Sequence, residues 1–171
     1  MSSSKKIVWP YYIRIIHWII ALTVVLNIFI LEEGDPPHRN LGYLALGLVL
    51  VRFFLGFINK KKNLFPALPL KWSDIKTHAT SHFNGPPVDY EGHTPLASVV
   101  YVLIWICLIG LAISGWMLGL DAFWGDETLE EIHGAISTGL EVLVVIHFIG
   151  IALDSYFWKR KTWMSMIKGY K

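Results

Sequence analysis

Long apolar runs separated by polar connections dominate the 171-residue chain. The runs occupy residues 7–31, 41–58, 95–120 and 132–157. A helix needs about 20 apolar residues to cross a hydrocarbon core of about 30 Å, and each run is close to that length or longer. The pattern therefore predicts an all-α integral membrane protein, a four-helix bundle that forms a single domain over residues 1–171, with one long connection at residues 59–94.

The composition supports a membrane protein and argues against an ordinary soluble domain. Hydrophobic residues make up 54% of the chain and charged residues only 16%, whereas soluble domains contain about 25% charged residues. No polar leader with a small-residue cleavage site precedes residue 7. We therefore expect the first run to be a permanent helix rather than a removed signal peptide.

Positive charge is distributed unevenly over the connections. Because Lys and Arg mark the cytoplasmic side, both termini and the connection 59–94 are expected to be cytoplasmic. Arg39 is the sole basic residue expected in the external connections. The basic residues expected on the cytoplasmic side are Lys5, Lys6, Lys60, Lys61, Lys62, Lys71, Lys76, Lys159, Arg160, Lys161, Lys168 and Lys171.

The external connections are acidic. Their carboxylates are Glu32, Glu33, Asp35, Asp121, Asp126, Glu127, Glu130 and Glu131. Two interpretations are open: the acids only serve topology and solubility, or they guide a basic redox partner such as a c-type cytochrome. Asp and Glu contribute little to topology, which favours the docking interpretation.

Two histidines of the fourth run mark two depths in the bundle. Fourteen helical residues separate His133 from His147, which corresponds to a rise of about 21 Å and to an angle of about 40° around the helix. When the four helices are threaded in and out of the membrane, His17 falls at the depth of His147, and His38 falls at the depth of His133. We expect an inner pair, His17 and His147, and an outer pair, His38 and His133, each held between two helices.

Imidazole pairs at two depths are typical of two six-coordinate b-type haems. The inner pair is predicted to bind one haem iron and the outer pair the other. Zinc is a weaker interpretation, because a structural zinc site needs four ligands at one depth and each depth offers two. Cys107 is the only cysteine, which excludes a Cys-rich iron–sulfur site and the paired attachment motif of c-type haem.

Three further residues accompany the expected haem sites. Gly42 lies one turn after His38 on the same face, where it allows the close approach of a flat ligand. Arg52 is predicted on the same helix face as His38, but at the inner depth. There it either pairs with a haem propionate or anchors the helix at the interface. Arg14 precedes His17 by three residues and is also expected to contribute to cofactor binding.

Four other polar residues have no settled role. Glu141, in the fourth run, is either a functional acid or a protonated group that is hydrogen-bonded inside the bundle. His78 and His82 have the spacing of a metal pair but lack a third ligand, so we interpret them as solvated residues of a short amphipathic helix over residues 71–83 on the inner membrane surface. His93, at the predicted inner end, competes with the inner pair as a ligand or contacts a propionate.

Several short motifs resemble those of one bacterial family. They are Arg14-x-x-His17-Trp18, His38-x-x-x-Gly42 with Arg52, Gly92-His93-x-Pro95, Ser114-Gly115-Trp116, His133 and His147 with Gly150, and Ser165-Met166-Ile167-x-Gly169. Together they resemble the bacterial cytochrome b561 and nickel–iron hydrogenase cytochrome b group over nearly the whole chain. The resemblance implies a four-helix membrane core, two b haems, and electron exchange between a quinone and a redox partner at the outer face.

The sequence thus predicts a di-haem b-type cytochrome of a respiratory chain, spanning the bacterial inner membrane. It would transfer electrons between a periplasmic partner, such as a c-type cytochrome, and the quinone pool. We expect no catalytic side chain and no nucleic-acid partner, and we leave open the direction of electron flow and whether the chain forms a homodimer. Two alternatives are a stand-alone oxidoreductase, such as a superoxide:quinone oxidoreductase, and a haem-free membrane anchor of a redox complex.

Overall fold

The computed structural model describes residues 8–58, 70–84, 94–157, 159 and 161–170. Within these residues the regular elements are all helical, and the four longest helices, α1, α2, α4 and α5, are long and apolar enough to cross a membrane. The predicted all-α membrane bundle is therefore confirmed. In chain order the elements are α1 (Tyr11–Phe29), α2 (Pro36–Ile58), α3 (Trp72–Asn84), α4 (Pro95–Leu118), the 3₁₀ turn η2 (Asp121–Phe123), α5 (Glu127–Phe157) and α6 (Thr162–Lys168).

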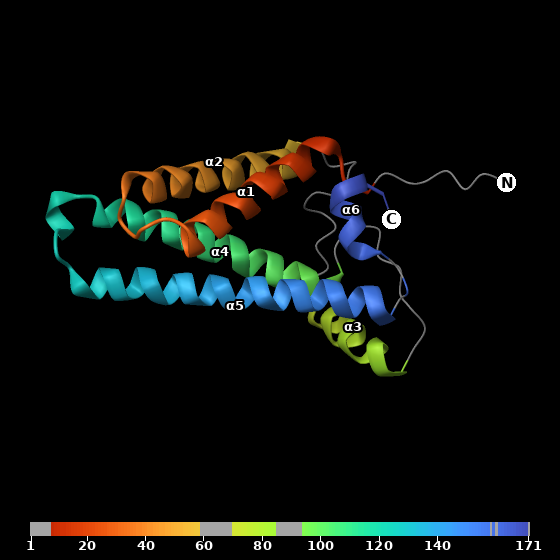
Figure 1. Cartoon of the computed structure of the whole chain (residues 1–171). Helices are drawn as coiled ribbons and strands as arrows, with labels where there is room; N and C mark the ends of the chain where they lie inside the picture. The colour runs from red at the N-terminus through yellow and green to blue at the C-terminus, as the bar shows by residue number, and fades with distance from the viewer. Residues whose placement is uncertain (1–7, 59–69, 85–93, 158, 160, 171) are drawn as a thin grey trace.

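The four long helices form two antiparallel hairpins, α1 with α2 and α4 with α5 (Figure 1). The hairpins are joined chiefly by contacts between α2 and α4. Within the described residues, α1 and α5 approach each other closely at few points. The rings of His17 on α1 and His147 on α5 lie between these two helices, with centroids 6.4 Å apart.

The hairpin end is the end of the bundle where α1 connects to α2 and α4 connects to α5. The two helices that begin there, α2 and α5, start earlier than the apolar pattern predicts. α2 begins at Pro36 and α5 at Glu127, whereas the sequence predicts spans from residues 41 and 132. Proline is tolerated in the first helical turn because no backbone donor is lost there, and the Asp126 carboxylate accepts a hydrogen bond from the Leu129 N–H at 3.0 Å, which caps α5. The earlier start of α2 brings His38, which precedes the predicted span, into regular helix, and the earlier start of α5 puts His133 in the second helical turn.

The bundle is apolar on its outside as well as in its core. Leu22 is 57% exposed and Phe148 is 66% exposed, as expected for helices that face hydrocarbon. The central core is formed by Val49 of α2, Leu108 of α4 and Leu140 of α5. Ile20 and Val24 of α1 pack against this core, which therefore connects all four long helices.

At the other end of the molecule, α6 packs against the start of α1 (Figure 1). The Gly169 carbonyl accepts hydrogen bonds from the N–H groups of Val8 at 2.8 Å and Trp9 at 3.1 Å. The Trp18 indole donates to the Met166 carbonyl at 3.2 Å. The two ends of the described chain therefore lie side by side, at the same end of the bundle, while the side of the membrane that they occupy stays a prediction.

The short helix α3 covers nearly the residues that the sequence predicts, and it packs against α4. Its Trp72 is 78% exposed. An exposed indole at the start of such a helix is consistent with the predicted position on the membrane surface, which stays a prediction.

Candidate functional site

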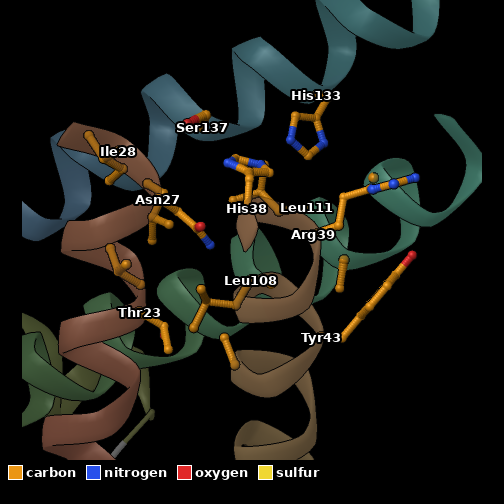
Figure 2. A pocket seen from close by; sticks show the side chains of 16 residues that line it. Thr23, Asn27, Ile28, His38, Arg39, Tyr43, Leu108, Leu111, His133 and Ser137 are labelled. Carbon is orange, nitrogen blue, oxygen red and sulfur yellow. The ribbon is translucent and has the colours of Figure 1, made fainter. Parts of the chain in front are cut away.

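The outer pair, His38 and His133, faces inward near the hairpin end of the bundle. His38 is in the first turn of α2, and His133 is in the second turn of α5. Their ring centroids are 6.3 Å apart and their planes are inclined by 57°. Figure 2 shows the two rings turned toward one another across the pocket.

The inner pair, His17 of α1 and His147 of α5, repeats this geometry closer to the chain termini. The ring centroids are 6.4 Å apart and the planes are inclined by 55°. The structure thus brings together the same histidine partners that the sequence predicts from their depths in the bundle. It also places one ligand candidate of each pair on α5, so that this helix connects the two sites.

The spacing within each pair fits one metal ion between two imidazoles. An imidazole nitrogen binds a transition metal at about 2 Å and lies about 1 Å from its ring centroid, so two imidazoles on opposite sides of a metal have centroids roughly 6 Å apart. Among the described residues there is no group of three or more His, Cys, Asp or Glu side chains that would hold a metal ion. The donor set therefore fits axial ligation of a haem iron and does not fit a tetrahedral zinc site.

A pocket lined by all four long helices surrounds the outer pair (Figure 2). Its wall is mainly apolar, with Leu108 and Leu111 of α4 among the lining residues. Gly42 also lines it, and a Cβ atom added at this glycine would meet no heavy atom within 4 Å. The predicted role of Gly42, leaving room for a flat ligand one turn from His38, is therefore compatible with the structure.

Two buried polar atoms at this pocket lack a partner. Asn27 Oδ1 and His38 Nδ1 are both inaccessible to solvent and have no hydrogen-bond partner within the described part of the chain. The Asn27 amide of α1 points into the pocket in Figure 2. Buried polar groups are nearly always hydrogen-bonded, so these atoms indicate a site that is completed by a bound group.

The opposite ring of the outer pair is held by α4. Ser114 Oγ lies 2.8 Å from His133 Nδ1. In the sequence, Ser114 is marked only by the Ser114-Gly115-Trp116 motif. Its 19-position separation from His133 gives no signal, because helical periodicity does not relate residues on two different helices. A small polar residue on an otherwise apolar helix is the one signal that points to it.

Arg52 and Arg14 differ in their surroundings. Arg52 is only 5% exposed, its guanidinium carbon is 6.0 Å from the Tyr101 ring centroid, and its Nη1 atom has no hydrogen-bond partner among the described residues. Arg14 instead donates a hydrogen bond from Nη1 to the Ile167 carbonyl. The structure therefore places Arg14 against the C-terminal segment, while the buried Nε of Arg14, like Nη1 of Arg52, has no hydrogen-bond partner among the described residues.

The remaining polar candidates lie outside the two pairs. Glu141 is exposed on α5 rather than enclosed in the bundle, so the interpretation as an acid that is hydrogen-bonded inside the bundle does not hold. His78 is 4% exposed, and thus buried rather than solvated as the sequence predicts. The side chain of His82 and all of His93 lie outside the described residues, so the competition of His93 for the inner site is not tested.

Comparison with protein families agrees with this geometry. The family model described as prokaryotic cytochrome b561 matches residues 8–169, which is nearly the whole chain. The chain belongs to the prokaryotic cytochrome b561 family. Comparison with curated proteins and with solved structures gave no match.

Membership of the cytochrome b561 family determines the general function. This cytochrome is a bacterial membrane protein that binds haem b and takes part in electron transfer. Haem is ligated by imidazoles in many b-type proteins, and the described residues bring two pairs of imidazoles together inside the bundle.

Proposed function

We propose that this cytochrome binds two b haems and carries single electrons across the bacterial inner membrane. One haem is held between His38 and His133, the other between His17 and His147. The observation that carries the proposal is the repetition of one ring spacing, 6.3 Å and 6.4 Å, at two depths along α5. Haem b, when bound, supplies the one-electron redox chemistry, for which the protein itself has no group.

The protein contributes ligands, orientation and exclusion of water. The four imidazoles would hold the two haems, and the apolar helices around them would keep the local dielectric constant low, which would tune the redox potential. His133 and His147 are both on α5, so the two proposed sites are separated by about 21 Å along this helix. In the proposed arrangement, one site lies toward each side of the membrane.

Arg52 is proposed to pair with a propionate at the inner haem. A guanidinium that is 5% exposed and has a free Nη1 is costly in the bundle unless an anion lies next to it. An arginine that anchors the helix at the interface would instead extend into water or headgroups. The burial of Arg52 therefore favours the propionate over the anchoring role.

Arg14 is proposed to act indirectly. Its Nη1 atom is engaged by the Ile167 carbonyl, and the next turn of α1 carries His17. Arg14 thus connects the C-terminal segment to the part of α1 that presents an inner ligand. The direct cofactor contact expected from the sequence stays a prediction, because the buried Arg14 Nε has no hydrogen-bond partner among the described residues.

Quinone and a periplasmic redox protein are the proposed partners. The family's role in electron transfer supports a redox partner in general, and the acidic connections next to the outer pair favour a basic protein there, such as a c-type cytochrome. A quinone is the lipid-soluble carrier that the family resemblance implies. In the proposed orientation the outer pair faces the periplasm and both termini are cytoplasmic.

The haem content tests the proposal directly. Purified protein assayed by the pyridine haemochrome method should contain about two haems b per chain, and its ferric form should have the low-spin spectrum of bis-histidine ligation. One haem or none per chain would contradict the di-haem proposal. Turnover of the isolated protein with quinone and superoxide, without a partner protein, would separate a stand-alone oxidoreductase from an electron carrier.

A further inference from the structure

The helix α4 contributes no histidine, yet it makes a close polar contact with the outer pair. Ser114 Oγ is 2.8 Å from His133 Nδ1. Ser114 is 5% exposed, so this contact is shielded from water. A hydrogen bond in such surroundings is not weakened by competition with solvent.

The other contacts of Ser114 determine which atom donates. A serine hydroxyl has one proton, and in Ser114 this proton is directed to carbonyls of the preceding turn of α4, those of Gly110 at 2.8 Å and Leu111 at 3.3 Å from Oγ. Toward His133 the oxygen is then an acceptor, so Nδ1 carries the imidazole proton. The same tautomer leaves Nε2 with its lone pair free, which is the form that a metal ion requires.

The residue next to Ser114 fixes the position of the ring. A Cβ atom added at Gly115 would lie 3.3 Å from His133 Cε1, so the imidazole rests against the backbone of α4. His38, on the opposite side of the site, has no such support: its Nδ1 atom has no hydrogen-bond partner among the described residues. The two rings of the outer pair are therefore held unequally.

We propose that Ser114 is a positioning residue that sets the tautomer of His133 and lowers the midpoint potential of the outer haem. An imidazole that donates Nδ1–H to an acceptor is a more basic ligand, and a more basic ligand stabilises ferric over ferrous iron. The proposal rests on the proposed function, because it assumes that His133 ligates iron. It deepens that function by assigning the tuning of one haem to a residue that does not contact it.

The test is a redox titration of full-length Ser114→Ala protein with its haems bound. The outer haem is identified as the one that His38→Ala lacks. Loss of one hydrogen bond should raise the ferrous-to-ferric ratio of the outer haem at a fixed ambient potential by about two- to tenfold, and should change the low-spin electron paramagnetic resonance signal of that haem alone. Ser114→Thr keeps the hydroxyl and should restore the wild-type potential.

Ser98→Ala is the matched control. Ser98 is also buried on α4, and its hydroxyl donates to the Thr94 carbonyl at 3.0 Å, the same bond to the preceding turn that Ser114 makes. This variant should leave the outer potential unchanged. If Ser114→Ala loses the outer haem alone while Ser98→Ala retains both, positioning of His133 is again supported.

An outer haem with the wild-type potential in Ser114→Ala would overturn the proposal. If that variant does not assemble, Ser114→Cys decides in its place, because a thiol fills the site but is a weak acceptor; a wild-type outer potential in Ser114→Cys would equally overturn it. Absence of haem from the wild-type protein would contradict the proposed function instead. If the wild-type protein holds two haems but neither Ser114→Ala nor Ser114→Cys shifts the outer midpoint potential, this inference alone is contradicted.

Discussion

At the scale of single residues, the pairing of the histidines predicts selective loss of haem. His38→Ala or His133→Ala should remove the outer haem, and His17→Ala or His147→Ala the inner one, because the two sites share α5 but no ligand. Each variant should retain about one haem per chain, measured by pyridine haemochrome. If the inner haem is retained in His17→Ala but lost in His93→Ala, the proposed inner pair is contradicted.

The charge of Arg52 predicts a change in the inner haem. Arg52→Gln removes a positive charge that favours the reduced iron, so the inner midpoint potential should fall. At an effective dielectric constant of about 20 and a separation of about 8–16 Å, the change is about 1–2 kcal/mol per electron. Arg52→Lys keeps the charge and should shift the potential less, and Arg39→Gln, at the other end of α2, serves as the matched control. An inner potential that is unchanged in Arg52→Gln would exclude the propionate pairing.

At the scale of elements, the contact between α6 and the start of α1 predicts a sensitive position. Gly169 has a φ of 83°, and an added Cβ would lie 2.9 Å from the Trp9 carbonyl oxygen. Gly169→Ala therefore adds a backbone clash to a left-handed strain of about 1–2 kcal/mol. We expect a lower midpoint of thermal unfolding, followed by circular dichroism, together with faster proteolysis of the C-terminal segment.

Gly125→Ala separates the clash from the strain. Gly125 has a similar φ of 73°, but no heavy atom lies within 4 Å of an added Cβ. This variant should therefore show the strain alone and unfold at a higher temperature than Gly169→Ala. Equal destabilisation by the two substitutions would mean that the close approach to Trp9 contributes nothing.

At the scale of the whole molecule, the acidic hairpin end predicts salt-dependent electron transfer. Glu127, Glu130 and Glu131 are exposed at the start of α5, immediately before His133. The Debye length falls from about 10 Å at 0.1 M salt to about 3 Å at 1 M. Bimolecular electron transfer with a basic c-type cytochrome, measured by stopped flow, should therefore slow as salt is added.

Neutralising these three glutamates to Gln should slow the same reaction at low salt and should change quinone reactivity little. Asp74→Asn, on α3 at the opposite end of the molecule, is the control and should have no effect on this reaction. Rates that are flat across the salt range, or that rise when the acids are removed, would mean that the acidic face is not an electrostatic docking site.

The sequence alone determined the class of fold and the partners within each histidine pair. The four apolar runs predict the number of long helices, because the thickness of a bilayer sets the length of a spanning helix. His133 and His147 define two depths, because the rise per residue is constant in a helix. The depths of His17 and His38 follow from the alternating direction of successive helices, which puts His17 level with His147 and His38 level with His133. All of these inferences depend on local periodicity and on the order of segments along the chain. Both can be read from the sequence without a structure.

Only the tertiary structure decided what surrounds these ligands. Ser114 reaches His133, Arg14 reaches the carbonyl of Ile167, and Glu141 turns outward on α5. None of these relations follows from spacing, because each depends on the rotation of one helix about its axis relative to its neighbours. That rotation results from the packing of many side chains at once. Depth along the bundle is therefore readable from the sequence, whereas the direction in which a side chain points across the bundle is decided by the folded structure.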